Sequence, residues 1–367
     1  MVGVLEKVNQ IVPYYRDFIE MHTKPYDYLI FIGRFQPFHL GHQAVVKKAL
    51  EYANRVMILV GSSYQPRSVR NPWSFDERKE FIRQSFVSEL FERLIILPLV
   101  DLYNDAKWVK LVETTVAENI IENQNNSDQV KIGLIGHSKD HSSYYLSLFP
   151  HWGAVDVSSY SDLSASPLRD HYFTFSEVPN GLSEAVSSIM QQFLQTDDYH
   201  YLKSEYEFIR EYRKSWELAP YPPTFVTVDA VVVKGGHILL IERKEHPGKG
   251  LLALPGGFVD THERLESALL RELYEETQIE LSKEMLSSSI CAKEVFDSPY
   301  RSARGRTISH AYLLVLEDKS IEINGADDAK RAFWYAIDEI DPEKMFEDHA
   351  HIIRRMLRMI PSTSTSL

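Results

Sequence analysis

The chain has 367 residues, 44% of them hydrophobic, which is enough for two domains with ordinary cores. Its formal net charge of −12 argues against DNA or an anionic membrane surface as a partner, but not against a small nucleotide held with a metal ion. The single cysteine, Cys291, excludes an internal disulfide and fits a reducing compartment. Because no apolar run reaches about 18 residues and no signal-peptide pattern is present, we expect a cytoplasmic protein without a membrane span.

Residues 1–26 precede the first predicted strand, and we interpret them as an N-terminal extension. From residue 27 onward, strands and helices alternate, which implies parallel strands joined by right-handed crossovers. We therefore predict that residues 27–196 form an α/β domain with a Rossmann-like, doubly wound parallel sheet. The expected strands are 28–32, 55–60, 93–99, 131–135 and 154–158, and the clearest expected helices are 43–50 and 105–122.

Residues 197–222 combine a helical segment rich in tyrosine and charged residues with the proline-rich run that ends at Pro223, and we interpret them as a linker. In residues 223–360 the pattern changes to a mixed sheet with helices. The expected strands are 225–233, 238–241, 289–296, 308–316 and 331–335, and the expected helices are 263–277 and 347–359. The Ser- and Thr-rich tail 361–367 is predicted to be disordered.

The stretch from Gly33 to His42 connects the first predicted strand to the helix after it. Gly41 lets the backbone come close to a ligand, and a helix start offers free N–H groups and the positive end of the helix dipole. His39 and His42 would then stand beside a bound anion, for which a phosphate chain is the natural candidate. Two ordinary surface histidines are the alternative for so short a motif, but strand, turn and helix follow in the order that a phosphate site needs.

Other residues of the first half fit the same kind of site. Arg34 could reach phosphates from the turn, and the pattern Ser164-x-Ser166-x-x-Arg169 at a helix start is a second anion site. Trp73 offers a flat ring on which a heteroaromatic base can stack, and its neighbour Asn71 offers an amide for hydrogen bonds. Core packing is the alternative for Trp73.

Four separated motifs together resemble the NMN adenylyltransferases of the archaeal type over about residues 27–195. They are Gly33 to His42, Asn71-Pro-Trp-Ser74 with Arg78, Gly136 to Asp140, and Ser164 to Arg169. The resemblance implies that the 5′-phosphate of NMN attacks the α-phosphorus of ATP in line, without a covalent intermediate. It implies catalysis by positioning and by charge neutralisation from Mg²⁺, His39, His42 and Arg169. It further implies nucleotide contacts from Gly33, Arg34, Phe35, Gly41, Asn71, Trp73, Arg78, Lys139, Asp140, Ser164 and Ser166.

Two rival readings share parts of this pattern. Class I aminoacyl-tRNA synthetases have the first motif, but the sequence lacks the lysine-rich loop that they also need. An adenylyltransferase acting on a different phosphate ester is the second rival.

On the predicted helix 263–277, Glu275 and Glu276 lie within about 60° of Glu272 around the helix axis. Three carboxylates repel one another unless cations lie between them, and hard divalent ions such as Mg²⁺ or Mn²⁺ are the expected ones. A solvated acidic face is the commoner meaning of such a pattern. That alternative does not explain Gly257 and Arg271 at their spacings, and Arg271 is expected to pair with Glu263.

This spacing resembles the Nudix box, and the similarity covers about residues 223–358, although Gln278 replaces the closing glycine. The resemblance implies an α/β/α domain and metal-dependent hydrolysis of a nucleoside diphosphate linked to another group. It implies that Glu272, Glu275 and Glu276 bind metal, that Glu275 and Glu276 are catalytic, and that Gly257 and Arg271 bind substrate. The segments Arg304 to Ile308 and Gly325 to Asp328, with Trp334, are similar to ADP-ribose pyrophosphatases, which implies substrate contacts from Arg304 and Arg306.

The sequence therefore predicts a bifunctional enzyme of NAD metabolism. We expect it to make NAD and pyrophosphate from ATP and NMN, and to hydrolyse ADP-ribose to AMP and ribose 5-phosphate. Mg²⁺, with Mn²⁺ as an alternative, is expected at both sites, and the partners are the small nucleotides ATP, NMN, NAD and ADP-ribose. One alternative is a Nudix half that only binds ADP-ribose or a related nucleotide as a regulatory module. Another is a Nudix-type transcription regulator, against which the acidic balance argues. No nucleic acid or membrane partner is expected, and a homo-oligomer is left open.

Overall fold

The computed structural model describes residues 24–123, 130–136, 147–157, 163–317, 323 and 329–360. The chain divides into two compact units, which are described separately. The first unit comprises Met1–Ser63, Phe75–Tyr172 and Glu177–Met190, and the second comprises Tyr64–Ser74, Phe173–Ser176 and Gln191–Leu367. Several predicted features lie outside the described residues: most of the extension 1–26, the tail 361–367, Lys139, Asp140, and the segment Gly325 to Asp328.

The first unit contains a five-stranded sheet in the order β3-β2-β1-β4-β5, and every neighbouring pair is parallel. Its strands are β1 Tyr26–Gly33, β2 Ala53–Val60, β3 Leu94–Pro98, β4 Ile132–Gly136 and β5 Gly153–Asp156. Its helices are α2 Leu40–Tyr52, α3 Phe75–Gln84, α4 Ser88–Phe91, α5 Asp105–Asn123, and all but the last three residues of α6 Ala165–Phe175 and of α7 Glu184–Phe193. The predicted Rossmann-like parallel sheet is confirmed, and the strand β1 at its centre leads directly into the first motif.

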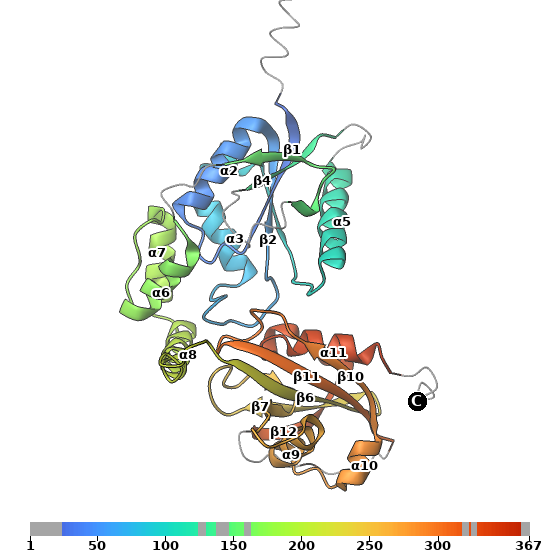
Figure 1. The fold of residues 1–367 in the computed structure, drawn as a ribbon. Helices are drawn as coiled ribbons and strands as arrows, with labels where there is room; N and C mark the ends of the chain where they lie inside the picture. Colours follow the sequence, from blue (N-terminus) through green and yellow to red (C-terminus); the bar gives the residue numbers. More distant parts are fainter. Residues whose placement is uncertain are drawn as a thin grey trace, which may run out of the picture. The chain divides into compact units, whose positions relative to one another are not determined.

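Helices pack on both faces of this sheet (Figure 1). Alternate residues of β1, such as Ile30 and Ile32, contact the α5 face, where Val112, Val116 and Ile120 are buried. Side chains alternate across a strand, so the intervening residues of β1 face the side that α2 covers. The near-continuous apolar runs of β1 and β2 are explained by this arrangement, because both faces of these central strands are covered by helices.

The second unit contains a mixed sheet in the order β10-β11-β6-β7-β12, to which β8 and β9 add at β7 and β6. Its strands are β6 Thr224–Lys234, β7 His237–Arg243, β8 Leu252–Ala253, β9 Gly256–Phe258, β10 Ile290–Phe296, β11 Arg306–Val315 and β12 Ala329–Ala336. The pair β11 and β6 is parallel and the other pairs are antiparallel. The short strands β8 and β9 were not predicted.

Helices cover both faces of this second sheet (Figure 1). Helix α9, Leu265–Thr277, buries Ala268, Leu269 and Leu273 against one face together with α10, Lys283–Ser288. Helix α11, His349–Leu357, buries an apolar stripe against the opposite face, and the short 3₁₀ helices η2 Ile337–Glu339 and η3 Pro342–Lys344 precede it. The predicted α/β/α arrangement with a mixed sheet is confirmed.

The segment that we interpreted as a linker contains helix α8, Asp197–Lys214, which groups with the second unit. Tyr201 donates a hydrogen bond to the carbonyl of Lys249 at 3.1 Å, and the buried carboxylate of Glu205 accepts one from the N–H of Gly248 at 2.8 Å. The linker assignment for 197–222 stays a prediction, and it includes a helix packed inside the second unit. Among the described helices, none has the length and apolar character needed to cross a membrane.

Candidate functional sites

The two histidines of the first motif cap the helix that follows them. His39 is the N-cap residue of α2, and its Nδ1 accepts a hydrogen bond from the N–H of His42 at 3.3 Å. The Nδ1 of His42 accepts one in return from the N–H of His39, also at 3.3 Å, and the rings stack with centroids 3.6 Å apart. Because each Nδ1 is an acceptor, the neutral form of each ring carries its proton on Nε2.

Two glycines make room for aromatic rings in this stretch. A Cβ atom on Gly41 would lie 3.0 Å from Cε1 and Nδ1 of His39, and one on Gly33 would lie 2.9 Å from the ring of the buried Phe35. Real Cβ atoms seldom approach other atoms so closely. Gly41 is therefore needed for the capping geometry itself, in addition to the ligand approach that the sequence predicted.

The Ser-x-Ser-x-x-Arg element lies next to the first motif. Arg169 is buried, and its Nη1 donates a hydrogen bond to the carbonyl of Gln36 at 2.6 Å, while Nη2 donates to Oγ of Ser166 at 3.2 Å. Ser164 and Ser166 are exposed at the start of α6. The structure thus brings these predicted residues together with the stretch from Gly33 to His42, because Arg169 ties the start of α6 to Gln36.

Arg78 joins the loops that follow two neighbouring strands. It is buried, and its guanidinium donates to the carbonyls of Arg34 at 2.8 Å, Gly61 at 2.6 Å and Ser62 at 3.3 Å. Burial lowers the pKa of Arg78 to about 10, so the group stays charged at neutral pH. These contacts make Arg78 a support for the loops after β1 and β2, and its predicted contact with nucleotide remains a prediction.

Asn71 and Trp73 lie in the segment that groups with the second unit. The Trp73 side chain is 2% exposed, and its ring centroid lies 5.9 Å from that of Phe193. Asn71 donates from Nδ2 to Oε1 of Gln65 at 3.3 Å. This burial favours the core-packing alternative for Trp73, since a stacking platform has to expose one ring face.

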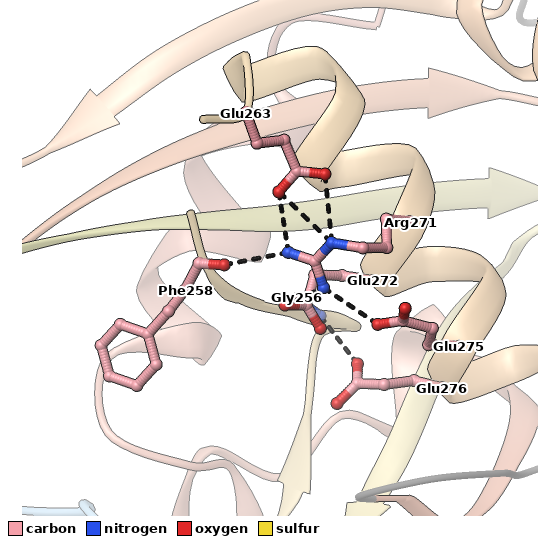
Figure 2. A network of polar contacts seen from close by, with 7 residues as sticks. All are labelled: Gly256, Phe258, Glu263, Arg271, Glu272, Glu275 and Glu276. Carbon is pink, nitrogen blue, oxygen red and sulfur yellow. Dashed lines mark hydrogen bonds and ion pairs between the residues drawn. The ribbon is translucent and has the colours of Figure 1, made fainter. Parts of the chain in front are cut away.

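In the second unit, Arg271 organises the acidic helix α9 (Figure 2). Its guanidinium donates to Glu263 at 2.9 and 3.1 Å, to Glu272 at 2.9 Å, to Glu275 at 2.9 Å and to the carbonyl of Phe258 at 3.1 Å. The hydrogen bond with Glu263 is the main cause that raises the pKa of Arg271, and it lowers the pKa of Glu263. The predicted pairing of Arg271 with Glu263 is present.

Glu276 faces the glycine strand β9 rather than Arg271. It is 5% exposed, and its Oε2 accepts a hydrogen bond from the N–H of Gly256 at 2.8 Å. A Cβ atom on Gly257 would lie 2.4 Å from Oε1 of Glu272, so only glycine leaves space for that carboxylate. Burial is the main cause that raises the pKa of Glu272 above its usual value.

The carboxylates of α9 have the right chemistry for a divalent cation but are not gathered around one point. Across the described parts of the chain, no three His, Cys, Asp or Glu side chains are arranged to hold a metal ion. Glu272 and Glu275 are bound to Arg271, and Glu276 is bound to the N–H of Gly256. All three supply the hard oxygen donors that Mg²⁺ and Mn²⁺ prefer, so the donor set fits such an ion. An ion would replace the contacts of Arg271 with Glu272 and Glu275.

Gln278 takes the backbone conformation for which glycine is the usual residue. It ends α9 with φ 47° and ψ 38°, in the left-handed region, and its N–H donates to the carbonyl of Tyr274 at 2.8 Å. The helix therefore ends at this position, and Gln278 itself takes the left-handed conformation. The glutamates of the preceding turns therefore keep their helical positions.

The loop between β10 and β11 brings a second arginine to β9. The guanidinium carbon of Arg304 lies 4.9 Å from the ring centroid of Phe258. Arg306 donates instead to the backbone carbonyl of Asp297, so it supports the loop. Phe258 was missed in the sequence, because an aromatic residue directly after a glycine pair carries no signal of its own.

A buried ionic network holds this loop, and the sequence did not reveal it. Arg301 makes two hydrogen bonds to Asp348, at 2.9 and 2.7 Å, and their side chains are 2% and 3% exposed. Nδ1 of His349 accepts from the N–H of Leu254 at 2.9 Å, and its Nε2 lies 3.7 Å from Oδ1 of Asp229. The network connects the start of α11 both to the loop that carries Arg304 and to the segment that leads into β9.

The two halves of the chain match two different family models. Residues 30–137 match the family described as cytidylyltransferase-like, and residues 223–356 match the NUDIX domain. A nicotinamide/nicotinic acid mononucleotide adenylyltransferase of Acinetobacter baylyi is 37% identical over 182 residues, which is 49% of this chain and 94% of that protein. An ADP-ribose pyrophosphatase of Methanocaldococcus jannaschii is 38% identical over 146 residues, which is 40% of this chain and 79% of that protein.

Solved structures match both halves at once. A crystal structure of a bifunctional NMN adenylyltransferase/ADP ribose pyrophosphatase from Francisella tularensis is 37% identical, has a TM-score of 0.84, and matches 91% of this chain and 99% of its own. The chain belongs to this bifunctional family. A second crystal structure of the Francisella protein, complexed with AMP and a manganese ion, has a TM-score of 0.82 at 36% identity, with the same coverage.

Membership of the bifunctional NMN adenylyltransferase/ADP ribose pyrophosphatase family confirms the two resemblances and their order along the chain. Neither of the two family models alone covers half of the chain. The Francisella structure, which matches both halves, shows the family membership. The transcription-regulator alternative is not supported, because the half that precedes the NUDIX domain is a cytidylyltransferase-like domain rather than a DNA-binding module.

Proposed function

We propose that the first unit transfers the adenylyl group of ATP to NMN and releases pyrophosphate, giving NAD. The carrying observation is the reciprocal cap of His39 and His42 at the start of α2, in which each Nδ1 accepts a backbone N–H and each neutral ring carries its proton on Nε2. In the reaction, an oxygen of the NMN 5′-phosphate bonds to the α-phosphorus of ATP, and the bond to pyrophosphate breaks. Arg169, tied to the same stretch through Gln36, adds the positive charge that the developing negative charge needs.

In the second unit, the proposed reaction is hydrolysis of ADP-ribose to AMP and ribose 5-phosphate. An oxygen of water bonds to one phosphorus of the diphosphate, and the bond to the bridging oxygen breaks. Glu272, Glu275 and Glu276 would hold Mg²⁺ or Mn²⁺, which supplies charge neutralisation and activates water. Arg271 orients Glu272 and Glu275, and its contact with Glu263 would keep it in place when those two carboxylates turn to a cation.

A hydrolase is favoured over a purely regulatory Nudix half by the geometry around Gln278. Gln278, which replaces the closing glycine of the Nudix box, adopts a left-handed conformation, and it follows the last glutamate of the helix. Glu276 keeps its hydrogen bond to Gly256 across β9, so the departure leaves the carboxylates of the preceding turns in place.

The finer ligand assignments are part of this proposal. ATP, NMN, NAD and ADP-ribose are the proposed small-molecule partners, and Mg²⁺ or Mn²⁺ is proposed at both sites. A cytoplasmic location also stays a proposal, and a homo-oligomer is still open.

The test incubates the full chain with ATP, NMN and Mg²⁺, and separately with ADP-ribose and Mg²⁺, and identifies the products by mass spectrometry. NAD with pyrophosphate is expected from the first mixture, and AMP with ribose 5-phosphate from the second. A chain that binds ADP-ribose in calorimetry but releases no AMP would support the regulatory module instead.

A further inference from the structure

The turn directly after helix α8 supplies an aromatic residue, Trp216, to a row of rings that leads to β9. The ring centroid of Trp216 lies 5.5 Å from that of Phe225 on β6, with the ring planes 66° apart, and Tyr212 lies 5.9 Å from the same ring. Phe225 in turn lies 5.6 Å from Phe258 at 64°. These residues all belong to the second unit, although Tyr212 and Trp216 precede the segment that matches the NUDIX model.

This row is continuous with the proposed hydrolase site. Phe258 directly follows Gly256 and Gly257, the residues that contact the carboxylates of α9. The guanidinium of Arg304 lies over Phe258, and its buried Nε donates no hydrogen bond to any residue that the structure describes. A positive group with an unused donor beside an aromatic ring is suited to a ligand that combines an anionic group with a planar, hydrogen-bonding one.

Helix α8 also holds the loop that carries this arginine. Nε of Arg213 donates to the carbonyl of Ala303 at 3.1 Å, and Gly305 lies so close to Phe225 that a Cβ on it would be 3.0 Å from the ring. Trp216 is 41% exposed, and its edge-to-face contact with Phe225 leaves ring surface open. An exposed tryptophan leaves apolar ring surface in contact with water, which is unfavourable in free energy. A flat ligand bound at this place would cover that surface.

We infer that Trp216, together with Phe225 and Phe258, forms the binding surface for the planar base of the nucleoside diphosphate in the hydrolase site. The inference rests on the proposed hydrolysis of ADP-ribose, whose AMP part carries the base. The segment 197–222, which was predicted to be a linker, would then contribute to substrate specificity. It supplies Trp216, which lies outside the NUDIX match. A protein partner covering Trp216 is the competing outcome.

The test uses the two reaction products as inhibitors of ADP-ribose hydrolysis by the full chain. AMP contains the base and ribose 5-phosphate does not, so a loss of stacking affects only the first. Because base–aromatic stacking contributes enough to change affinity about tenfold or more, Trp216→Ala should raise the inhibition constant of AMP by about tenfold. The inhibition constant of ribose 5-phosphate and the kcat should change less than about twofold, and Trp216→Tyr should restore most of the affinity for AMP.

Phe208→Ala is the matched control, because Phe208 lies on α8, eight residues before Trp216, and is 39% exposed, close to the value for Trp216. It stacks on Tyr212 rather than on Phe225, so the inhibition constant of AMP should stay unchanged.

An unchanged inhibition constant of AMP in Trp216→Ala would overturn the inference. An equal rise of the constants for both products would also overturn it, because Trp216 would then act only through the fold. If the wild-type chain hydrolyses no ADP-ribose, the proposed function fails; calorimetry with ADP-ribose then decides the inference, and equal affinity in wild type and Trp216→Ala would overturn it.

Discussion

Each of His39 and His42 accepts the backbone N–H of the other at 3.3 Å, so the two rings cap helix α2 reciprocally. A Ser or Thr with a Glu or Gln three residues later makes the same pair of bonds in many helices. Here the capping bonds also fix the ring tautomers, because each Nδ1 is used as an acceptor. The capping bonds use Nδ1 of the two side chains and the proposed phosphate contacts use Nε2, so mutation can separate helix capping from the proposed phosphate binding.

We predict that His42→Gln keeps the helix cap but loses NAD synthesis. Glutamine at this position can accept the N–H of His39, so the free energy of unfolding should change by less than about 1 kcal/mol. The imidazole donor is lost, and removal of one such donor costs on the order of 100-fold in rate. Steady-state NAD formation and thermal unfolding test the two parts. His42→Ala should lose both the rate and about 1 kcal/mol of stability, and a His42→Gln variant with normal NAD synthesis would remove His42 from the site.

Glu276→Gln should stop ADP-ribose hydrolysis without unfolding the second unit. The amide oxygen of glutamine can still accept the hydrogen bond from the N–H of Gly256, so the local structure should persist. The variant loses the negative charge that a divalent cation needs, and we expect a fall in kcat of about 100-fold or more. AMP release measures this, and NAD synthesis by the same protein is the internal control. Full hydrolysis by Glu276→Gln would mean that Glu276 has only a structural role.

Gln278→Gly should leave hydrolysis intact and stabilise the second unit. Gln278 has φ 47°, and a non-glycine residue in this region costs roughly 1–2 kcal/mol, part of which the greater flexibility of unfolded glycine offsets. The expected net gain is up to about 1 kcal/mol, visible as a higher melting temperature. If the wild-type chain is silent on ADP-ribose and Gln278→Gly hydrolyses it, the strained residue disables the site and the regulatory alternative is correct.

The stability of the second unit should fall in mild acid because of His349. Burial lowers the pKa of His349 from its usual 6.5 to about 3, so between these values the unfolded chain binds the proton and the folded chain does not. The free energy of unfolding therefore decreases as the pH falls below 6.5, by up to about 1.4 kcal/mol per pH unit. Asp229 has the opposite effect on the free energy of unfolding. Burial raises the pKa of Asp229, so as the pH falls the folded chain binds this proton at a higher pH than the unfolded chain does.

The variant His349→Asn isolates this effect. The amide oxygen of asparagine can replace Nδ1 as the acceptor for the N–H of Leu254, and it does not titrate. Between pH 7 and pH 5 the wild type should lose about 2 kcal/mol more than the variant in urea unfolding, while the contribution of Asp229 is common to both. Equal losses would show that His349 is not the titrating group.

The sequence predicted the elements whose patterns are local. The apolar runs of β1 and β2 and the periodic apolar face of α9 follow from spacing alone, as does the pairing of Arg271 with Glu263 eight residues away. The short strand β9 could not be predicted, because only three residues define it and its pairing partner lies far away on β6.

Contacts between distant segments account for the other differences. The ion pair of Arg301 with Asp348 joins residues 47 positions apart, and neither residue belongs to a motif. Helix α8 is a second example, because its composition suggested a linker. The hydrogen bond that Glu205 accepts from the N–H of Gly248, 43 positions away, instead packs the helix against the second unit. Trp73 had two interpretations from the sequence, and only its burial against Phe193 distinguishes them.

The most direct test of the two-site proposal is a single reaction mixture that contains ATP, NMN, ADP-ribose and Mg²⁺, analysed with three proteins. The wild type should form both NAD and ribose 5-phosphate, His42→Gln should form only ribose 5-phosphate, and Glu276→Gln should form only NAD. This separation is expected because the two side chains belong to different units of the chain. Loss of both products in either variant, with the fold intact by circular dichroism, would contradict two independent sites in one chain.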